Sequence, residues 1–290
     1  MSKHTDLTQK VRGLLSGAPI GTIERVSGNY GRDQQGRVYF IESVEQREIR
    51  ERIGRQKREG RKETFVFNVM DKMPYVGDVL TSAQCGYLLV LSTYVNYDGL
   101  IVTSERDGEA MSRNRMLSVL GLKESQRSTL SEFITACLCY GIMKEVDDGL
   151  VISSAIHTKG KVSTPNVVRS YVTRLRDMAR TNKPEHIGFL YKLIPHIHKH
   201  SNILCENPNE DIPSKRGKLN RKQIAEATGV SVGYVTRLTS KMTYNGHSVF
   251  AKITTATEGT FYMLNPQIFR RADVVYDPTT CEIFGLYDNR

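Results

Sequence analysis

An internal repeat constrains the fold of this chain more than any other feature of its sequence. The apolar segment GYLLVLS at residues 86–92 is matched by GFLYKLI at residues 188–194, and a second match links Gly121 to Gly229. The offset is 102 residues at the first match and 108 at the second, so the two registers are similar but not identical. This pattern predicts two diverged modules with one common fold.

Each half of the repeat predicts the same order of elements. In the first half, the alternating segment 65–69 predicts a strand, and an Asp-Gly corner between apolar runs predicts a hairpin. The elements expected there are helices over 82–97, 111–120 and 124–140 and a hairpin over 142–152. The elements expected in the second half are a helix opening at 188, helices over 220–228 and 231–244, and a hairpin over 249–264. A helix-turn-helix followed directly by a hairpin predicts a winged helix.

The 290 residues therefore divide into two modules, a connector between them, and one segment at each end of the chain. We expect an α+β protein, mainly helical with small β-wings, in which two winged-helix modules are joined by a basic helical connector. Thr164-Pro165 predicts the start of the connector helix, which would cover 167–179. The expected boundaries are 1–63 for an N-terminal region with a basic arm, 64–158 for module 1, 159–183 for the connector, 184–272 for module 2 and 273–290 for a C-terminal tail.

The basic arm at residues 44–62 contains eight Lys and Arg among four Glu. Its only aliphatic residues are Val44, Ile49 and Ile53, a stripe too thin to anchor a helix in a core. Two interpretations remain open. The segment is either a solvated helix or linker with i,i+4 ion pairs, or a cationic arm that lies along a phosphate backbone.

The clearest helix-turn-helix lies in module 2, at residues 221–238 with the sequence RKQIAEATGVSVGYVTRL. Ala225 is small enough for close helix packing, and Gly229 allows the positive φ that the turn requires. Val230, Val235 and Leu238 are spaced to face the core. The remaining positions form the exposed N-terminal face that would enter a major groove, with Ser231, Tyr234, Thr236 and Arg237 among them.

The charge pattern supports a nucleic-acid partner. The chain has 41 Lys and Arg against 31 Asp and Glu, a formal net charge of +10. Between Lys215 and Lys241 there are seven cations and a single acid, Glu226. We expect double-stranded DNA to bind here, with base contacts from Arg237 and Tyr234 and phosphate contacts from Arg221, Lys222, Lys241 and the hairpin residue Lys252. A protein-interaction domain with the same fold remains an alternative.

Module 1 differs in charge. Residues 105–149 hold six cations and eight acids, and the predicted hairpin turn is Asp147-Asp148-Gly149, which phosphate repels. We therefore expect module 1 to add less DNA affinity, or to serve as a homodimer contact. The candidate DNA contacts outside module 2 are Arg113 and Arg115 for phosphate, Gln126 and Arg127 for bases, and Arg174 in the connector.

Short motifs resemble a known group of proteins. The segment NILCENP at 202–208, the helix-turn-helix, and FYMLNP at 261–266 with Phe269-Arg270-Arg271 behind it resemble replication-control and DNA-binding proteins of bacterial plasmids and phages. The YMLNP portion is similar to plasmid replication initiators of Gram-positive bacteria. Over residues 80–272, the resemblance implies paired winged helices and sequence-specific DNA binding in replication initiation or replicon control. It also implies nucleoid association in a bacterial host and contact with the replication or transcription machinery. A winged-helix repressor is the alternative.

A histidine cluster offers a different chemistry. His196 and His200 would share one face of a helix as a metal pair, and His-aliphatic-His is also the metal motif of rolling-circle nicking enzymes. The third interpretation is a polar, exposed helix end. No phosphate-binding loop, nucleophile elbow, Cys-x-x-Cys pair or dinucleotide fingerprint occurs. We therefore expect no enzymatic activity, cofactor or metal, with the nickase as a distant alternative.

The compartment follows from three negative signals. No stretch approaches 18 consecutive apolar residues, which predicts no membrane span, and the polar N-terminus predicts no signal peptide. Five Cys are few and odd in number, which favours free thiols over a disulfide framework. We expect a cytoplasmic protein.

Overall fold

The computed structural model describes residues 23–27, 30–40, 47, 64–104, 108–160, 162, 164–271 and 278–285. The chain separates into two units, Met1–Glu59 and Gly60–Arg290. Helices and sheets are both prominent, so the expected α+β class is confirmed. Most of the predicted basic arm at 44–62 and most of the tail at 273–290 lie outside the described residues.

The described part of the first unit is a three-stranded antiparallel sheet of β1 (Ile23–Ser27), β2 (Tyr30–Asp33) and β3 (Val38–Phe40). Asp33 organises the turn between β2 and β3. Its carboxylate accepts hydrogen bonds from the backbone N–H groups of Gln35 and Arg37, from Arg37 Nε at 2.7 Å and from the Tyr39 hydroxyl. Burial raises the pKa of Asp33, but these hydrogen bonds together outweigh it and lower the pKa to about 2.

A four-stranded sheet forms the centre of the second unit, in the order β13-β8-β4-β7. Its strands are β4 (Phe65–Val69), β7 (His157–Thr158), β8 (Val167–Tyr171) and β13 (Phe269–Arg270). The antiparallel pair β4 and β8 is centred on Phe67 opposite Arg169, residues that are 102 apart in the sequence. Because this is also the repeat offset, the pairing is symmetric, and the two halves of the unit are related by an approximate two-fold axis through this point.

The helices repeat with the same offset. After β4 come η1 (Met70–Lys72), α3 (Met73–Val79) and α4 (Ser82–Ser92), and after β8 come α7 (Val172–Thr181) and α8 (Pro184–Leu193). We call β4 to β7 the first copy and β8 to β13 the second copy. The predicted connector helix over 167–179 is therefore wrong in its first five residues, which form β8. Val167 and Val168 are β-branched, and pairing with β4 stabilises them as a strand.

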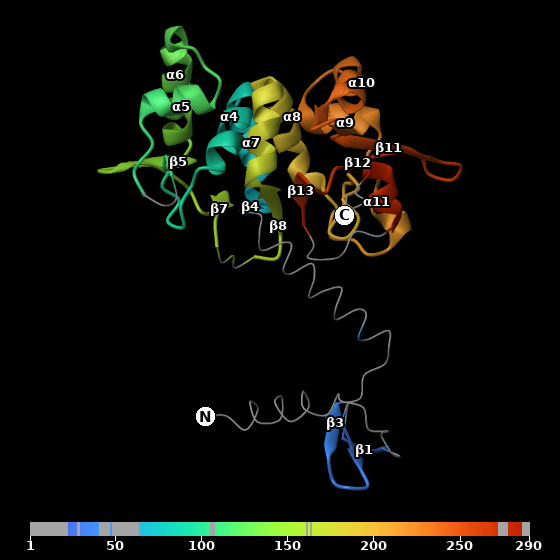
Figure 1. Ribbon diagram of the computed structural model, residues 1–290. Helices are drawn as coiled ribbons and strands as arrows, with labels where there is room; N and C mark the ends of the chain where they lie inside the picture. Colours follow the sequence, from blue (N-terminus) through green and yellow to red (C-terminus); the bar gives the residue numbers. More distant parts are fainter. Residues whose placement is uncertain are drawn as a thin grey trace. The chain divides into compact units, whose positions relative to one another are not determined.

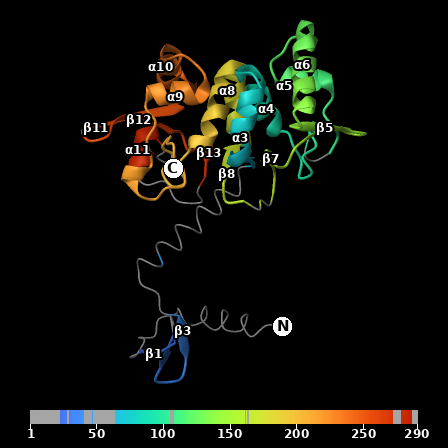
Figure 2. The ribbon, with the colours of Figure 1, turned by 180° about the vertical axis from the view of Figure 1, so that it is seen from behind.

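The two copies meet where α4 crosses α8, side by side at the centre of the unit (Figures 1 and 2). The crossing is closest at Gly86 and Gly188. A Cβ atom on Gly86 would lie 2.1 Å from the carbonyl oxygen of Pro184, and one on Gly188 would lie 1.6 Å from that of Ser82. Ser82 and Pro184 are again equivalent positions, so each copy presents its glycine to the first turn of the other copy's helix. Only glycine fits at these two sites.

Each flank of the unit holds a helix pair and a hairpin, as the sequence predicts (Figure 1). On the first-copy flank these elements are α5 (Arg113–Val119), α6 (Arg127–Cys139), β5 (Met143–Val146) and β6 (Gly149–Ile152). The short helix η2 (Glu124–Gln126) leads directly into α6. On the second-copy flank they are η3 (Ile194–His196), η4 (Pro213–Lys215), α9 (Arg221–Thr228), α10 (Val232–Lys241), β11 (Phe250–Thr255), β12 (Gly259–Leu264) and α11 (Pro278–Phe284).

Two helices end earlier than the sequence predicts. The helix expected over 82–97 stops at Ser92, and the one expected over 231–244 stops at Lys241. In the second case β9 (Thr243–Tyr244) pairs with β10 (His247–Ser248). The turn between them is Asn245-Gly246 with positive φ at both residues, which is the geometry that favours a tight two-residue hairpin. The Asn-Gly signal thus outweighs the helical periodicity there.

A buried polar group joins the central sheet to the helices. The Asn68 side chain donates to Val168 O at 2.8 Å and to Ser170 Oγ at 2.6 Å, so its Oδ1 accepts from Nδ1 of His157 at 3.0 Å. Nε2 of His157 is buried and has no hydrogen-bond partner among the described residues, and its ring lies edge-on to Tyr191. Burial lowers the pKa of His157 to about 3, so the folded chain holds it neutral.

We predict that Gly188→Ala lowers the free energy of unfolding by roughly 3 kcal/mol or more, because the new methyl group meets a backbone oxygen that cannot move alone. Gly233→Ala is the matched control, since a Cβ there meets nothing within 4 Å. We expect it to leave stability unchanged or to raise it by up to about 1 kcal/mol. Urea unfolding of both variants measures the difference. Equal stability of the two variants would contradict the close crossing.

We also predict that His157 makes the second unit acid-sensitive. A histidine that is neutral when folded gains a proton on unfolding below its ordinary pKa of about 6.5, so stability is full above that pH and falls below it. The contribution is about 1.4 kcal/mol per pH unit. His157→Asn should reduce the slope of unfolding free energy between pH 6 and pH 4.5 by that amount, as measured by urea midpoints. An unchanged slope in His157→Asn would contradict the burial of a neutral imidazole at this position.

Candidate nucleic-acid interface

Local hydrogen bonds define both ends of the helix pair α9–α10. Asn220 caps α9 by accepting from the backbone N–H groups of Lys222 and Gln223, and the Gln223 side chain accepts from Asn220 N in return. The helix ends at Gly229, which has a φ of +69°. Ser231 then caps α10 by accepting from Tyr234 N at 3.2 Å. The two helices expected from the sequence, and the glycine at which the first of them ends, are therefore present.

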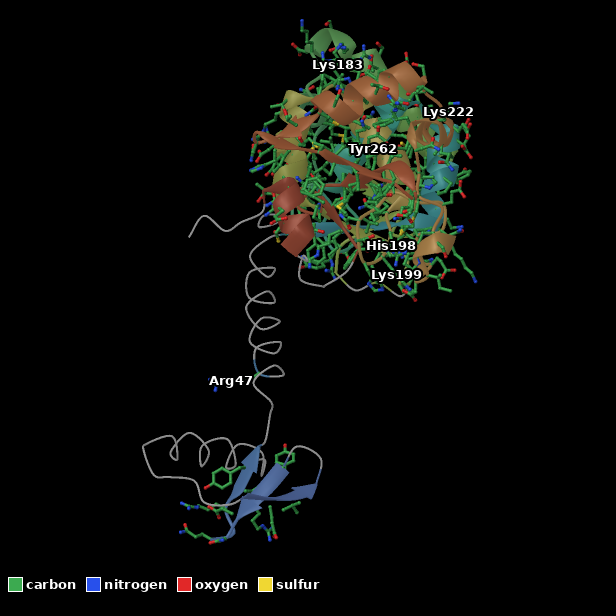
Figure 3. The ribbon with its side chains drawn as sticks, turned by 90° about the vertical axis from the view of Figure 1, so that its right-hand side faces the viewer. Arg47, Lys183, His198, Lys199, Lys222 and Tyr262 are labelled. Atoms are coloured by element: carbon green, nitrogen blue, oxygen red, sulfur yellow. The ribbon has the colours of Figure 1, made fainter. Side chains whose placement is uncertain are left out.

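The inner face of α10 is apolar, as the sequence predicts. Val235 and Leu238 are buried, and Val230 is partly buried against the same core. The opposite face is exposed and holds Ser231, Val232, Gly233, Thr236, Arg237, Ser240 and Lys241. Arg221 of α9 donates to Thr236 Oγ1 at 3.4 Å, which links the exposed sides of the two helices. Lys222 lies at the periphery of the unit (Figure 3).

Tyr234 does not belong to the exposed face. It is half-buried between α10 and α8, edge-on to His186 and Phe189 with ring centroids 6.1 and 6.3 Å apart. Burial raises the pKa of its hydroxyl. The Arg237 guanidinium lies over the Tyr234 ring at 4.9 Å. Tyr234 therefore packs α10 onto α8 and supports Arg237 from below, a role that the sequence did not predict.

The hairpin β11–β12 adds one exposed cation, Lys252. A second cation, Lys218, is engaged within the fold: its Nζ forms an ion pair with Glu258 and lies over the Phe261 ring at 4.2 Å. This contact joins the segment before α9 to the far end of the hairpin. The position of the hairpin relative to α9 is thus fixed by a charge pair and a cation–π contact.

The corresponding cations of the first copy are mostly engaged locally. Arg127 pairs with Glu124 at 2.6 Å, and Arg113 lies 3.8 Å from Glu145 on β5. The Gln126 side chain accepts from the backbone N–H of Lys123 at 2.9 Å and so caps its own helix. Arg115 is exposed. The two copies therefore share a backbone arrangement but differ in the charge that they offer.

The cations of the predicted connector hold the fold together. Arg174 donates to Gln267 O at 2.8 Å and lies over the Tyr171 ring. Arg176 donates to the side-chain and backbone oxygens of Thr93 and lies 3.7 Å from the centre of the Tyr94 ring. These contacts join α7 to the end of α4 and to the segment before β13. The expected DNA contact of Arg174 would require it to leave its partner.

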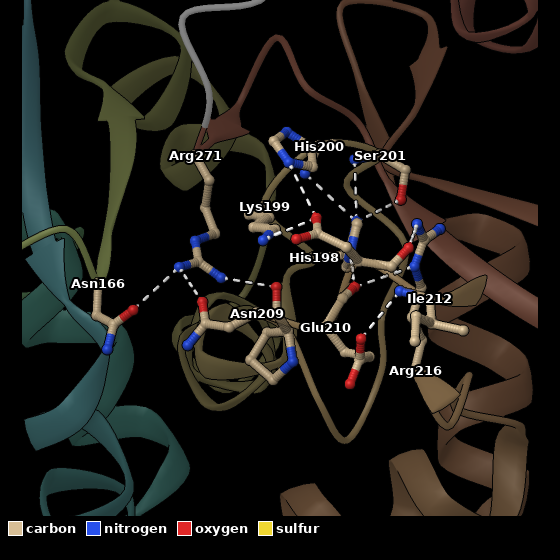
Figure 4. Close-up of polar contacts among 12 residues, drawn as sticks. Asn166, His198, Lys199, His200, Ser201, Asn209, Glu210, Ile212, Arg216 and Arg271 are labelled. Carbon is tan, nitrogen blue, oxygen red and sulfur yellow. Dashed lines mark hydrogen bonds and ion pairs between the residues drawn. The ribbon is translucent and has the colours of Figure 1, made fainter. Parts of the chain in front are cut away.

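The histidine cluster is divided among separate backbone contacts. His196 ends the short helix η3, so the helical face that would pair it with His200 does not form. His196 Nδ1 contacts Cys205 O, while the buried His198 bonds Glu210 O through Nε2 and accepts from Ser201 through Nδ1 (Figure 4). His200 lies 3.5 Å from the Asp211 carboxylate. The part of the chain that the structure describes contains no group of three or more side chains placed to hold a metal.

Arg271 is a structural residue that sequence reasoning missed. Its guanidinium donates to the carbonyl oxygens of Ile197 and Pro208 and to the side chains of Asn166 and Asn209 (Figure 4). It thereby ties the segment before β8 to the loop before α9. Burial lowers its pKa, and these acceptors compensate the buried charge. No local signal in the sequence identifies these partners, because they are 62 to 105 residues away.

None of the described helices is long and apolar enough to cross a membrane. No protein-family model matches the chain, and no curated protein or solved structure matches it either. The function can therefore be inferred only from the placement of side chains and charges in the chain itself.

Proposed function

We propose that the chain is a sequence-specific double-stranded DNA-binding protein of a plasmid or phage that acts in replication initiation or replicon control. In this proposal α9, α10 and the hairpin β11–β12 form a winged-helix module. The observation that supports this proposal is a set of exposed cations on these elements, namely Arg221, Lys222, Arg237, Lys241 and Lys252. Within the described part of the chain, none of these five cations forms an ion pair with a carboxylate.

The geometry suits a major groove. A groove about 12 Å wide admits one helix, and α10 presents an outer face of small and polar residues that allows a close approach. Arg237, supported by Tyr234, is the candidate base contact because a guanidinium can bond two acceptors of guanine at once. Lys222 and Lys241 would contact phosphate from the two helices, and Lys252 from the wing.

The duplication supports a secondary role for the first copy. Its helix α6 lies on the same side of the central sheet as α10 in both ribbon views, so one chain could reach two grooves (Figures 1 and 2). However, Arg113 and Arg127 are paired with Glu145 and Glu124, and its hairpin turn is Asp147-Asp148. We therefore propose that the first copy adds less affinity, and that a homodimer contact or a partner of the replication machinery uses part of its surface.

The choice between initiation and repression is a question about the DNA site. Selection of bound fragments from random DNA, followed by footprinting, answers it. Direct repeats beside an AT-rich tract support replication initiation, whereas one palindrome over a promoter supports transcriptional repression. Recovery of no enriched sequence would contradict sequence-specific binding. The nickase alternative gains no support from the described histidines, because each is engaged separately.

We predict that Arg237→Ala weakens binding to the selected site by roughly 5- to 150-fold, which corresponds to about 1–3 kcal/mol for a lost base contact. Arg127→Ala is the matched control, because this cation opens the equivalent helix of the first copy and is already paired with Glu124. We expect less than a threefold effect from it. Fluorescence anisotropy on the selected site and on random DNA measures both. An equal loss on the two DNAs would assign Arg237 to phosphate.

We predict that Tyr234→Phe binds DNA within about twofold of the native chain, because the ring that supports Arg237 and packs on α8 is retained. Tyr234→Leu removes the aromatic face and should reduce discrimination between the selected site and random DNA toward that of Arg237→Ala. Circular dichroism checks that both variants fold. A larger loss in Tyr234→Phe than in Tyr234→Leu would show that the hydroxyl itself touches DNA.

A further inference from the structure

One helix, α11, covers the hairpin of the second copy. It comes after the second copy in the sequence, and the described part of the first copy has no equivalent helix. Helix α11 packs against β11 and β12, with Phe284 buried among Ile203, Phe261 and Met263 (Figure 1). In the first copy the chain passes from β6 to β7 and then to β8, and the described residues between these strands form no helix. The repeat therefore allows the same face to be compared with and without its cover.

The backbone pairing makes the comparison residue by residue. Leu100 forms a bridge with Val151 in the first copy, as Ile203 does with Met263 in the second. Leu100 and Val151 consequently occupy the positions that α11 covers. Both are only half-buried, whereas Ile203 and Met263 are 8% and 5% exposed. The first copy thus leaves part of this apolar face open.

A groove of about 300 Å³ adjoins this face at Val151, and Leu100 is not part of its lining. Its lining includes Met143, Lys144, Val151 and Ser153, together with Asp98 and Gly141. Of the apolar residues in its lining, Met143 and Ile152 are buried, so the half-buried Val151 is the apolar contact that the groove offers.

The charge around the groove selects the kind of partner. The groove lining holds one exposed acid, Asp98, and one exposed cation, Lys144, and the adjoining β5–β6 turn adds the exposed acids Asp147 and Asp148. Glu145 lies on the opposite face of β5, 3.8 Å from Arg113, and does not face the groove. Helix α11 itself carries Glu282 and is flanked by Asp277 and Asp288 in the sequence. Like charges therefore disfavour α11 of a second copy as the occupant.

We propose that the face formed by Leu100 and Val151, with the groove beside it, docks a short cationic amphipathic helix of a partner protein, whose aromatic side chain would sit on these two residues as Phe284 sits on Ile203 and Met263. The acids of the β5–β6 turn would face Lys or Arg of the partner. The proposal is independent of DNA binding, because the acidic hairpin and the cations of α9 and α10 belong to different copies.

Two labelled peptides test the proposal. Both match residues 277–289 with Cys281→Ser, and the cationic one also has Asp277→Lys, Glu282→Lys and Asp288→Lys. Each is titrated with the full chain and followed by fluorescence anisotropy. We expect the cationic peptide to bind at least tenfold more tightly than the acidic one. Val151→Asn in the chain should weaken its binding about tenfold, with circular dichroism as a check on folding.

A charge swap makes the test independent of any folding defect. The double variant Asp147→Lys and Asp148→Lys changes only an exposed turn and should reverse the preference between the two peptides. The matched control, Ala256→Lys and Thr257→Lys in the exposed turn of the other hairpin, should leave it unchanged. Tighter binding of the acidic peptide to the native chain would assign the groove to a second copy and overturn the proposal. Absence of binding, or a preference that the charge swap does not alter, would overturn it as well.

Discussion

The close approach of α4 and α8 at Gly86 and Gly188 determines how the rest of the second unit is arranged. Each glycine lies against the first helical turn of the other copy, so the two contacts are equivalent and must form together. The β4–β8 strand pairing has the same symmetry, because its central pair also joins residues that are 102 apart in the sequence. Strands β7 and β13 then extend the sheet on opposite sides. Any side chain at the crossing would separate the copies and shift both flanking helix pairs. The spacing of α6 and α10 on the flanks thus depends on two missing methyl groups.

The sequence predicts the features that local chemistry controls. The hairpin over 142–152 follows from an Asp-Gly corner, and α9 follows from its Asn cap and the glycine at its end. By contrast, Val167–Tyr171 becomes a strand because β4, about 100 residues earlier, offers it a partner. Arg176 and Arg271 bond to acceptors that lie 62 to 105 residues away in the sequence. Contacts at that separation leave no local pattern in a single sequence.

The candidate interface shows the same division. The outward position of Arg237 and the inward position of Val235 follow from helical spacing. Tyr234 lies between these two faces, and spacing alone places it near the exposed one. Its burial depends on Phe189 and His186 of α8, an element that belongs to the central crossing rather than to the helix pair. The crossing therefore also sets the support beneath Arg237, which links the packing of the core to the proposed base contact.

The two copies have kept one scaffold and changed what it exposes. In the second copy, α11 covers the hairpin and the cations of α9 and α10 are unpaired within the described chain, so its surface offers charge to a polyanion. In the first copy, Glu124 and Glu145 pair with Arg127 and Arg113, and the hairpin face is left partly open beside an acidic turn. An acidic, partly apolar surface is unfavourable for phosphate but suits a cationic protein segment. Because the glycine crossing holds both copies rigidly together, a partner bound to the first would be carried to a fixed position beside any DNA bound to the second.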